Sequence, residues 1–115
     1  MLIYCAHAFG GDEAKKYKAA QKIKKIQLSD LKNTYISPIH AFGAFYDAIP
    51  YDMGMELCFD LLTACDEILV MSEVSKGVLA EIQLAQKLHM PVRFTSEQLK
   101  RRYQRNGVYI ESQPP

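Results

Sequence analysis

Two carboxylates stand at positions where they could take part in chemistry. Glu81 falls on the apolar stripe of a helix expected over Gly77–Leu88, and Asp60 flanks the Leu57–Leu61 stripe of the preceding helix. Burying an unpaired carboxylate is strongly unfavourable, so Glu81 on that stripe is either costly or functional. Cleavage at a sugar anomeric carbon, including that of an N-glycosidic bond, uses one carboxylate at the carbon and another to handle a proton. The structural alternative is that Glu81 favours the positive end of its helix while Asp60 is solvated.

The segment Ser75-Lys76-Gly77 at the start of the same helix could hold an anion. Backbone N–H groups and the helix dipole favour a phosphate there, and Gly77 permits a close approach. The full P-loop pattern is absent, which argues against a nucleoside triphosphatase. The structural alternative is that Ser75 only caps the helix.

Histidine and aromatic side chains gather in two other loops. His7 and His40 are expected to form hydrogen bonds or to shape a substrate site, because no third metal ligand is spaced to join them. The sequence therefore predicts neither a metal nor a cofactor. Aromatic residues in these loops could stack on a nucleobase, with core or lid packing as the alternative: Phe9, Phe42, Phe45 and Tyr46.

Short apolar segments alternate with helical patterns along the chain. The expected strands are Leu2–Cys5, Thr34–Ser37, Ile68–Met71, Val92–Thr95 and Val108–Ile110, and the expected helices cover 12–28, 51–64, 77–88 and 96–105. This alternation predicts one α/β domain over residues 1–115, a three-layer, flavodoxin- or Rossmann-like parallel sheet of about five strands with helices on both faces. In the helix over 51–64, the residues predicted to face inward are Met53, Leu57, Leu61 and Ala64.

The loops that follow the strands should lie together. Right-handed crossovers place every strand-to-helix loop at one edge of a parallel sheet, where ligands bind. That edge carries residues 7–11, 38–50 and 72–77, so three loops far apart in sequence meet at one predicted site. A loop as long as 38–50 in a compact domain is often a binding loop or a lid.

Composition narrows the class of protein. The formal net charge of +1 argues against a partner held by bulk electrostatics, so nucleic acid is not the expected partner. No apolar run reaches the roughly 20 residues of a membrane span, and the N-terminus lacks the pattern of a signal peptide. The three cysteines form no CxxC pair and suit reduced thiols, which predicts a cytoplasmic protein.

Four stretches carry a resemblance to a known family: LIYCAHAFGG, YISPIHAFG, LCFDLLTACDEILV and SKGVLAEIQLAQKLHMPV. Together they resemble the nucleoside 2-deoxyribosyltransferase-like superfamily over roughly residues 1–95. Within it, the chain is similar to small phage and bacterial proteins of undefined role and to the 2′-deoxynucleoside 5′-phosphate N-hydrolases. The most specific part of the resemblance is Ser75-x-Gly77-x-x-x-Glu81.

The resemblance implies roles for particular residues. Ser75 and Gly77 would hold a 5′-phosphate, Glu81 would be the nucleophile on C1′, and Asp60 would contact the sugar and assist the reaction. It also implies a homodimer, because family members often complete the pocket across subunits. The expected substrate-binding positions are Tyr4, Ala6, His7, Phe9, Gly10, His40, Phe42, Ser75, Lys76 and Gly77.

Three functions are set against each other. The first is cleavage or transfer at the N-glycosidic bond of a deoxynucleoside or its 5′-monophosphate, which depends on Glu81 facing inward and sharing a cavity with Asp60. The second is non-catalytic binding of a nucleotide or nucleotide-derived signal in the same pocket. Phe9 and Leu79 favour it, because they stand where the N-hydrolases have Arg and Gly. The third is an interaction protein whose basic last helix binds a partner or nucleic acid through Lys100, Arg101, Arg102 and Arg105.

Overall fold

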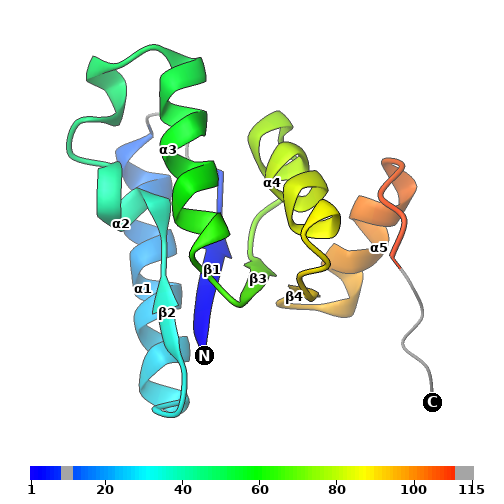
Figure 1. The fold of residues 1–115 in the computed structure, drawn as a ribbon. Coiled ribbons are helices and arrows are strands. Elements are labelled where there is room, and N and C mark those ends of the chain that lie inside the picture. The colour runs from blue at the N-terminus through cyan, green and yellow to red at the C-terminus, as the bar shows by residue number, and fades with distance from the viewer. Residues whose placement is uncertain (9–11, 111–115) are drawn as a thin grey trace.

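The computed structural model describes residues 1–8 and 12–110 and is an α/β fold built on a parallel sheet (Figure 1). The strands in this part of the chain are β1 (Leu2–Ala6), β2 (Thr34–Ile36), β3 (Glu67–Val70) and β4 (Val92–Phe94), in the spatial order β2-β1-β3-β4. The helices are α1 (Glu13–Ser29), α2 (Pro38–Phe42), the 3₁₀ helix η1 (Tyr46–Ala48), α3 (Tyr51–Thr63), α4 (Lys76–Lys87) and α5 (Glu97–Arg105). The predicted α/β class with a parallel sheet is confirmed.

Strand β1 lies inside the sheet, between β2 and β3. Tyr4 stands opposite Ile36 on one side and Ile68 on the other. All side chains from Ile3 to Ala6 are buried, as expected for a parallel strand that is covered on both faces. Because side chains alternate along a strand, Tyr4 and Ala6 point to the face opposite that of Ile3 and Cys5.

Helices cover both faces of the sheet. Helix α1 packs through Ile23 against Cys5, whereas α3 and α4 pack through Leu62 and Ile82 into the cluster that contains Tyr4. In Figure 1, α4 lies beside α3, and α5 follows at the right of the view, beyond β4. Among the described residues, no helix combines the length and apolar character needed to cross a membrane.

The expected fifth strand at Val108–Ile110 does not form. After α5, Gly107 adopts a positive φ of 91°, and the Val108 N–H donates to the Tyr103 carbonyl at 3.1 Å. The chain therefore turns after α5. The side chain of Gln86, which lies on α4, donates to the Tyr109 carbonyl at 2.6 Å. These contacts hold the segment away from the free edge of β4, so the sheet ends there.

The long loop expected over 38–50 is largely helical. Ser37 caps α2 by accepting from the Ile39 N–H at 3.1 Å, and Pro38 occupies the first helical position, where its fixed φ is favourable. Helix η1 follows and leads into α3. Ser37 and Pro38 thus form a helix start. The prediction of a loop, which relied on the apolar composition of the segment, was wrong here.

The inward stripe of α3 differs from the predicted one. Met53 is 54% exposed, whereas Met55, Cys58 and Leu62 are buried, so the helix is rotated by about one residue from the expected orientation. The rotation turns Asp60 outward, because it lies two residues, or about 200°, beyond Cys58 around the helix.

Replacing Ile68 with Ala tests this account of the core. Ile68 is fully buried at the centre of β3, so we expect the free energy of unfolding in urea to fall by about 2–5 kcal/mol. The matched control is Leu31→Ala, at a side chain that is 80% exposed, where a change of no more than about 0.5 kcal/mol is expected. Equal effects in the two variants would contradict the arrangement.

Candidate functional site

Glu81 is a buried carboxylate on the inward face of α4. Its side chain is 5% exposed and lies between Val78 and Ile82, which are both buried in the main core. The predicted inward orientation of Glu81 is therefore found. The helix cannot turn this carboxylate to water without exposing the apolar residues one turn away on the same face.

Two side chains from other elements meet Glu81. The hydroxyl of Tyr4 on β1 lies next to the Glu81 carboxyl and the thiol of Cys58 on α3, close enough to affect the pKa of both groups. Neither the Tyr4 hydroxyl nor Glu81 Oε2 has a hydrogen-bond partner of good geometry among the described residues. Buried polar groups are rarely left without partners in folded proteins, so the Tyr4–Cys58–Glu81 cluster has free capacity to bind a polar ligand.

Burial controls the charge of this cluster. It raises the pKa of the Glu81 carboxyl to about 7, and the Tyr4 hydroxyl lowers that pKa in part. The pKa of the Cys58 thiol is raised to about 11, first by burial and then by the Glu81 charge. No basic side chain contributes to the Glu81 shift. Near neutral pH the carboxyl is thus about half ionised, and its negative charge is available to a cationic centre or an electrophilic carbon.

Tyr46, in η1, lies beside the cluster. It packs against α3 at Gly54, where an added Cβ would lie 2.7 Å from the tyrosine ring. The pKa of Tyr46 is raised to about 12, mainly by burial and then by Cys58, with a smaller effect of Glu81. Access of a ligand to Glu81 therefore requires Tyr46 and its neighbours on α3 to move.

The predicted anion site, Ser75-Lys76-Gly77, lies at the start of α4, next to side chains of α3. Ser75 caps α4 by accepting from the Val78 N–H at 3.2 Å, so its structural role is present. A Cβ on Gly77 would lie 3.5 Å from both Met55 Sδ and the Tyr51 hydroxyl. The Lys76 ammonium stands 5.7 Å from the centre of the Tyr51 ring. Side chains of α3 thus lie against the backbone at the start of α4, where a phosphate was predicted to bind.

The loops after β1 and β3 meet, as the sheet edge predicted. The Ala8 N–H donates to Ser72 Oγ at 2.9 Å, which joins the two loops directly. His7 is half-buried, and its Nδ1 lies 2.7 Å from the Ala8 carbonyl, a hydrogen bond in which the ring nitrogen donates. Burial lowers the pKa of His7, which favours the neutral ring. Ala6 is fully buried within the core beneath these loops.

Other expected site residues lie apart from Glu81 or outside the described chain. Asp60 is exposed on the outer side of α3, so the structure does not bring the two carboxylates together. His40 is exposed on α2, and Phe42 packs edge-on against Phe45 with ring centres 6.1 Å apart. Phe9 and Gly10 lie outside the described residues.

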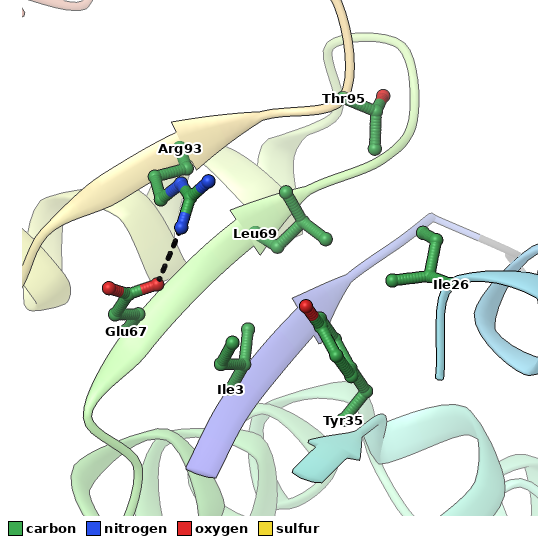
Figure 2. Close-up of a pocket in the computed structure, with 7 residues that line it drawn as sticks. All are labelled: Ile3, Ile26, Tyr35, Glu67, Leu69, Arg93 and Thr95. Atoms are coloured by element: carbon green, nitrogen blue, oxygen red, sulfur yellow. Dashed lines mark hydrogen bonds and ion pairs between the residues drawn. The ribbon is translucent and has the colours of Figure 1, made fainter. Parts of the chain in front are cut away.

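Two surface hollows lie elsewhere. One, of about 330 Å³, is on the opposite face of the sheet, where Arg93 Nη1 approaches Glu67 Oε2 at 3.4 Å over Ile3 and Leu69 (Figure 2). The other, of about 320 Å³, follows α5 and is lined by Gln98, Arg101, Arg102 and Arg105. Neither includes Glu81, so the candidate site is the covered Tyr4–Cys58–Glu81 cluster. Within the described ranges, no three His, Cys, Asp or Glu side chains gather to hold a metal ion.

Sequence reasoning missed the residues that α3 contributes. The sequence indicates only a reduced thiol at Cys58 and predicts no contact of Tyr46 or Cys58 with Glu81. One signal was available: Gly54 stands inside a helical pattern, where glycine is unfavourable unless another group approaches the backbone closely.

Gly54→Ala tests the packing of Tyr46. In an ordinary helix this change stabilises by up to about 1 kcal/mol, but here the new methyl group would overlap the Tyr46 ring. We therefore expect the free energy of unfolding to fall, by about 1–3 kcal/mol. The control is the same change combined with Tyr46→Ala, measured against Tyr46→Ala alone, where the helix-favouring gain should reappear. A stabilised single variant would contradict the close packing.

Glu81→Gln tests the electrostatic cost of the buried carboxylate. The folded protein keeps the Glu81 proton up to pH about 7, while the unfolded chain loses it near pH 4.5, so protonation stabilises the folded state. This stabilisation is fully present below pH 4.5 and is lost as the pH rises to about 7. Gln is neutral throughout, so the variant should gain about 3 kcal/mol relative to the parent between pH 4.5 and pH 8. Urea denaturation of both proteins at several pH values measures this, and parallel profiles would exclude the raised pKa.

A model of a known protein family matches the chain. No curated protein is significantly similar to the chain. A family model matches residues 1–95, which include every strand, the Tyr4–Cys58–Glu81 cluster and the loops around it, and end before α5. Its description is "Domain of unknown function (DUF7768)". The match covers most of the sequence, and the chain therefore belongs to the DUF7768 family.

Proposed function

We propose that this protein cleaves or transfers at the N-glycosidic bond of a deoxynucleoside or deoxynucleoside 5′-monophosphate, with Glu81 as the nucleophile. One observation carries the proposal: Glu81 is a 5% exposed carboxylate with a pKa near 7 and without a basic partner among residues 1–8 and 12–110. A strongly perturbed titratable group among converging polar side chains is typical of catalytic sites. The resemblance of Ser75-x-Gly77-x-x-x-Glu81 to the N-hydrolase pattern supports the same assignment.

The proposed reaction has two displacements at C1′. The ionised Glu81 carboxylate attacks C1′, the C–N bond breaks, and its electron pair leaves with the base, which takes a proton from solvent. Water or a second base then attacks C1′ of the deoxyribosyl ester and loses a proton to solvent, the C1′–O bond to Glu81 breaks, and the Glu81 carboxylate is released. In this scheme the Tyr4 hydroxyl, which lies next to the Glu81 carboxyl, would turn to donate to it and orient the attacking oxygen. The buried carboxylate of Glu81 also stabilises the positive charge that develops on the sugar.

A 5′-phosphate would lie at the start of α4. Backbone N–H groups and the helix dipole favour an anion at this position, and Lys76 adds a positive charge. Tyr51 and Met55 lie against Gly77, so they must move before a phosphate can enter. The proposal thus includes a movement of the start of α3, on which access to Glu81 also depends.

The structure does not meet the condition that Glu81 shares a cavity with Asp60, so the scheme is limited to Glu81 and gives Asp60 no catalytic part. It is exposed on the outer side of α3, two residues from Cys58, and cannot share a buried site with Glu81 in this arrangement. This placement favours the second candidate function, in which the same pocket binds a nucleotide without turnover. Both candidates use Glu81 and the start of α4, and they differ in whether base is released.

Release of free base from a panel of deoxynucleosides and their 5′-monophosphates tests the proposal. Glu81→Gln keeps the shape of the side chain but removes the nucleophile, so kcat/KM should fall at least about 10³-fold. The matched control is Glu56→Gln, an exposed carboxylate on α3, which should keep activity within about twofold of the parent. Activity of the parent should rise with pH through about 7, as Glu81 ionises.

Equal base release by the parent and Glu81→Gln would exclude Glu81 as the nucleophile. Native mass spectrometry on the same panel then separates the remaining cases. A retained, intact nucleotide without base release would select the binding function.

A further inference from the structure

We propose that Tyr103 on α5 is a positioning residue for the two loops that border the Glu81 site. The identity of the site rests on the proposed function, but the contacts of Tyr103 do not. Helix α5 lies beyond the residues that the family model matches, so this role comes from the chain's own C-terminal part.

The Tyr103 hydroxyl is held against the loop between β3 and α4. The side chain is fully buried, and its hydroxyl donates to the carbonyls of Ser72 at 2.9 Å and Glu73 at 3.0 Å. The ring packs on Phe94, with centres 5.5 Å apart. Burial raises the pKa of Tyr103 to about 12, so the hydroxyl remains a donor at neutral pH. A single donor thus fixes two successive carbonyls of one loop.

Ser72 passes this constraint to the loop after β1. Its hydroxyl accepts from the Ala8 N–H at 2.9 Å and donates to the Glu73 carbonyl at 3.2 Å. The Ala8 carbonyl is in turn the acceptor for His7 Nδ1 at 2.7 Å. The Tyr103 hydroxyl therefore determines where Ser72 lies, and Ser72 determines where Ala8 and His7 lie.

The same loop leads into the start of α4. Ser75, the N-cap of α4, follows Glu73 by two residues, so the position of Glu73 limits where the helix can begin. The negative charge of Glu81 contributes to the raised pKa of Tyr103, which places the hydroxyl within electrostatic range of the carboxylate. An exposed ion pair between Arg102 and Glu73 joins the same two segments, but exposed pairs contribute little. The buried hydroxyl is therefore the principal tie.

A purely structural role for Tyr103 would need only its ring. The ring of Tyr103 packs on Phe94 and belongs to the same core cluster as Leu99. The ring of a phenylalanine would make these apolar contacts equally well. Burying a hydroxyl is unfavourable unless it is hydrogen-bonded, and here both partners are loop carbonyls next to the site. Removing the hydroxyl alone thus separates loop positioning from core packing.

Amide hydrogen exchange in the full chain tests this inference. In Tyr103→Phe, the Ala8 amide should exchange roughly two- to tenfold faster, the factor for loss of about one hydrogen bond. The α1 amides near Ile23 should be unchanged, because α1 lies on the other face of the sheet. The matched control is Tyr109→Phe, at a side chain that is 76% exposed, which should leave the Ala8 amide as in the parent. An unchanged Ala8 amide in Tyr103→Phe, or equal acceleration throughout the chain, would overturn the proposal.

Ser72→Ala provides the second arm. It removes the acceptor of the Ala8 N–H directly, so adding Tyr103→Phe should produce no further acceleration at Ala8. Full additivity of the two substitutions at that amide would overturn the route through Ser72.

Binding measurements keep this inference distinct from the proposed function. If deoxynucleoside 5′-monophosphates bind the parent, Tyr103→Phe should weaken their binding several-fold, and Tyr109→Phe should not. Unchanged affinity in Tyr103→Phe would overturn the role of Tyr103 at this site. Failure of the parent to bind any of them would count against the proposed function, whereas the exchange rates would still decide whether Tyr103 positions the loops.

Discussion

The burial of one ionisable carboxylate beside a tyrosine hydroxyl is the constraint on which the candidate site depends. Raising the pKa of Glu81 from its usual value near 4.5 to about 7 corresponds to about 3 kcal/mol against the charged form. That cost is a substantial part of the net stability of a small domain. The core around Val78 and Ile82 must offset it, because these residues hold α4 in the orientation that points Glu81 inward.

The cover over Glu81 gives the site two properties. Glu81 is 5% exposed, with Tyr46 within electrostatic range and with Met55 and Tyr51 against Gly77 on the same helix, and burial strengthens electrostatic interactions inside the cluster. The same side chains close the entrance, so any ligand must displace the start of α3. That part of the chain follows α2 and η1, two short helices, and is the natural place for such a movement because short elements make few contacts.

The contacts of α5 extend the site beyond its nearest side chains. The Tyr103 hydroxyl binds two loop carbonyls, and Ser72 binds the Ala8 amide, so elements from both ends of the chain meet above the carboxyl ends of β1 and β3. In parallel sheets this edge is where ligands bind, because the strand-to-helix loops converge there. Here those loops are joined by a hydrogen bond between Ala8 and Ser72, which are 64 positions apart in sequence.

Local sequence signals were sufficient to predict the strands of the sheet, the longer helices and the inward carboxylate, but not α2 and η1. The apolar runs, the cap at Ser75, and the helical spacing of Val78 and Ile82 depend only on neighbouring residues, and each of these signals is matched in the structure. The tertiary structure decided the rest. Packing against Tyr46 rotated α3, which brought Cys58 to Glu81 and turned Asp60 to solvent. The sequence could not show this, because the rotation of a helix with apolar residues on several sides is chosen by what it packs against, and those partners come from other parts of the chain.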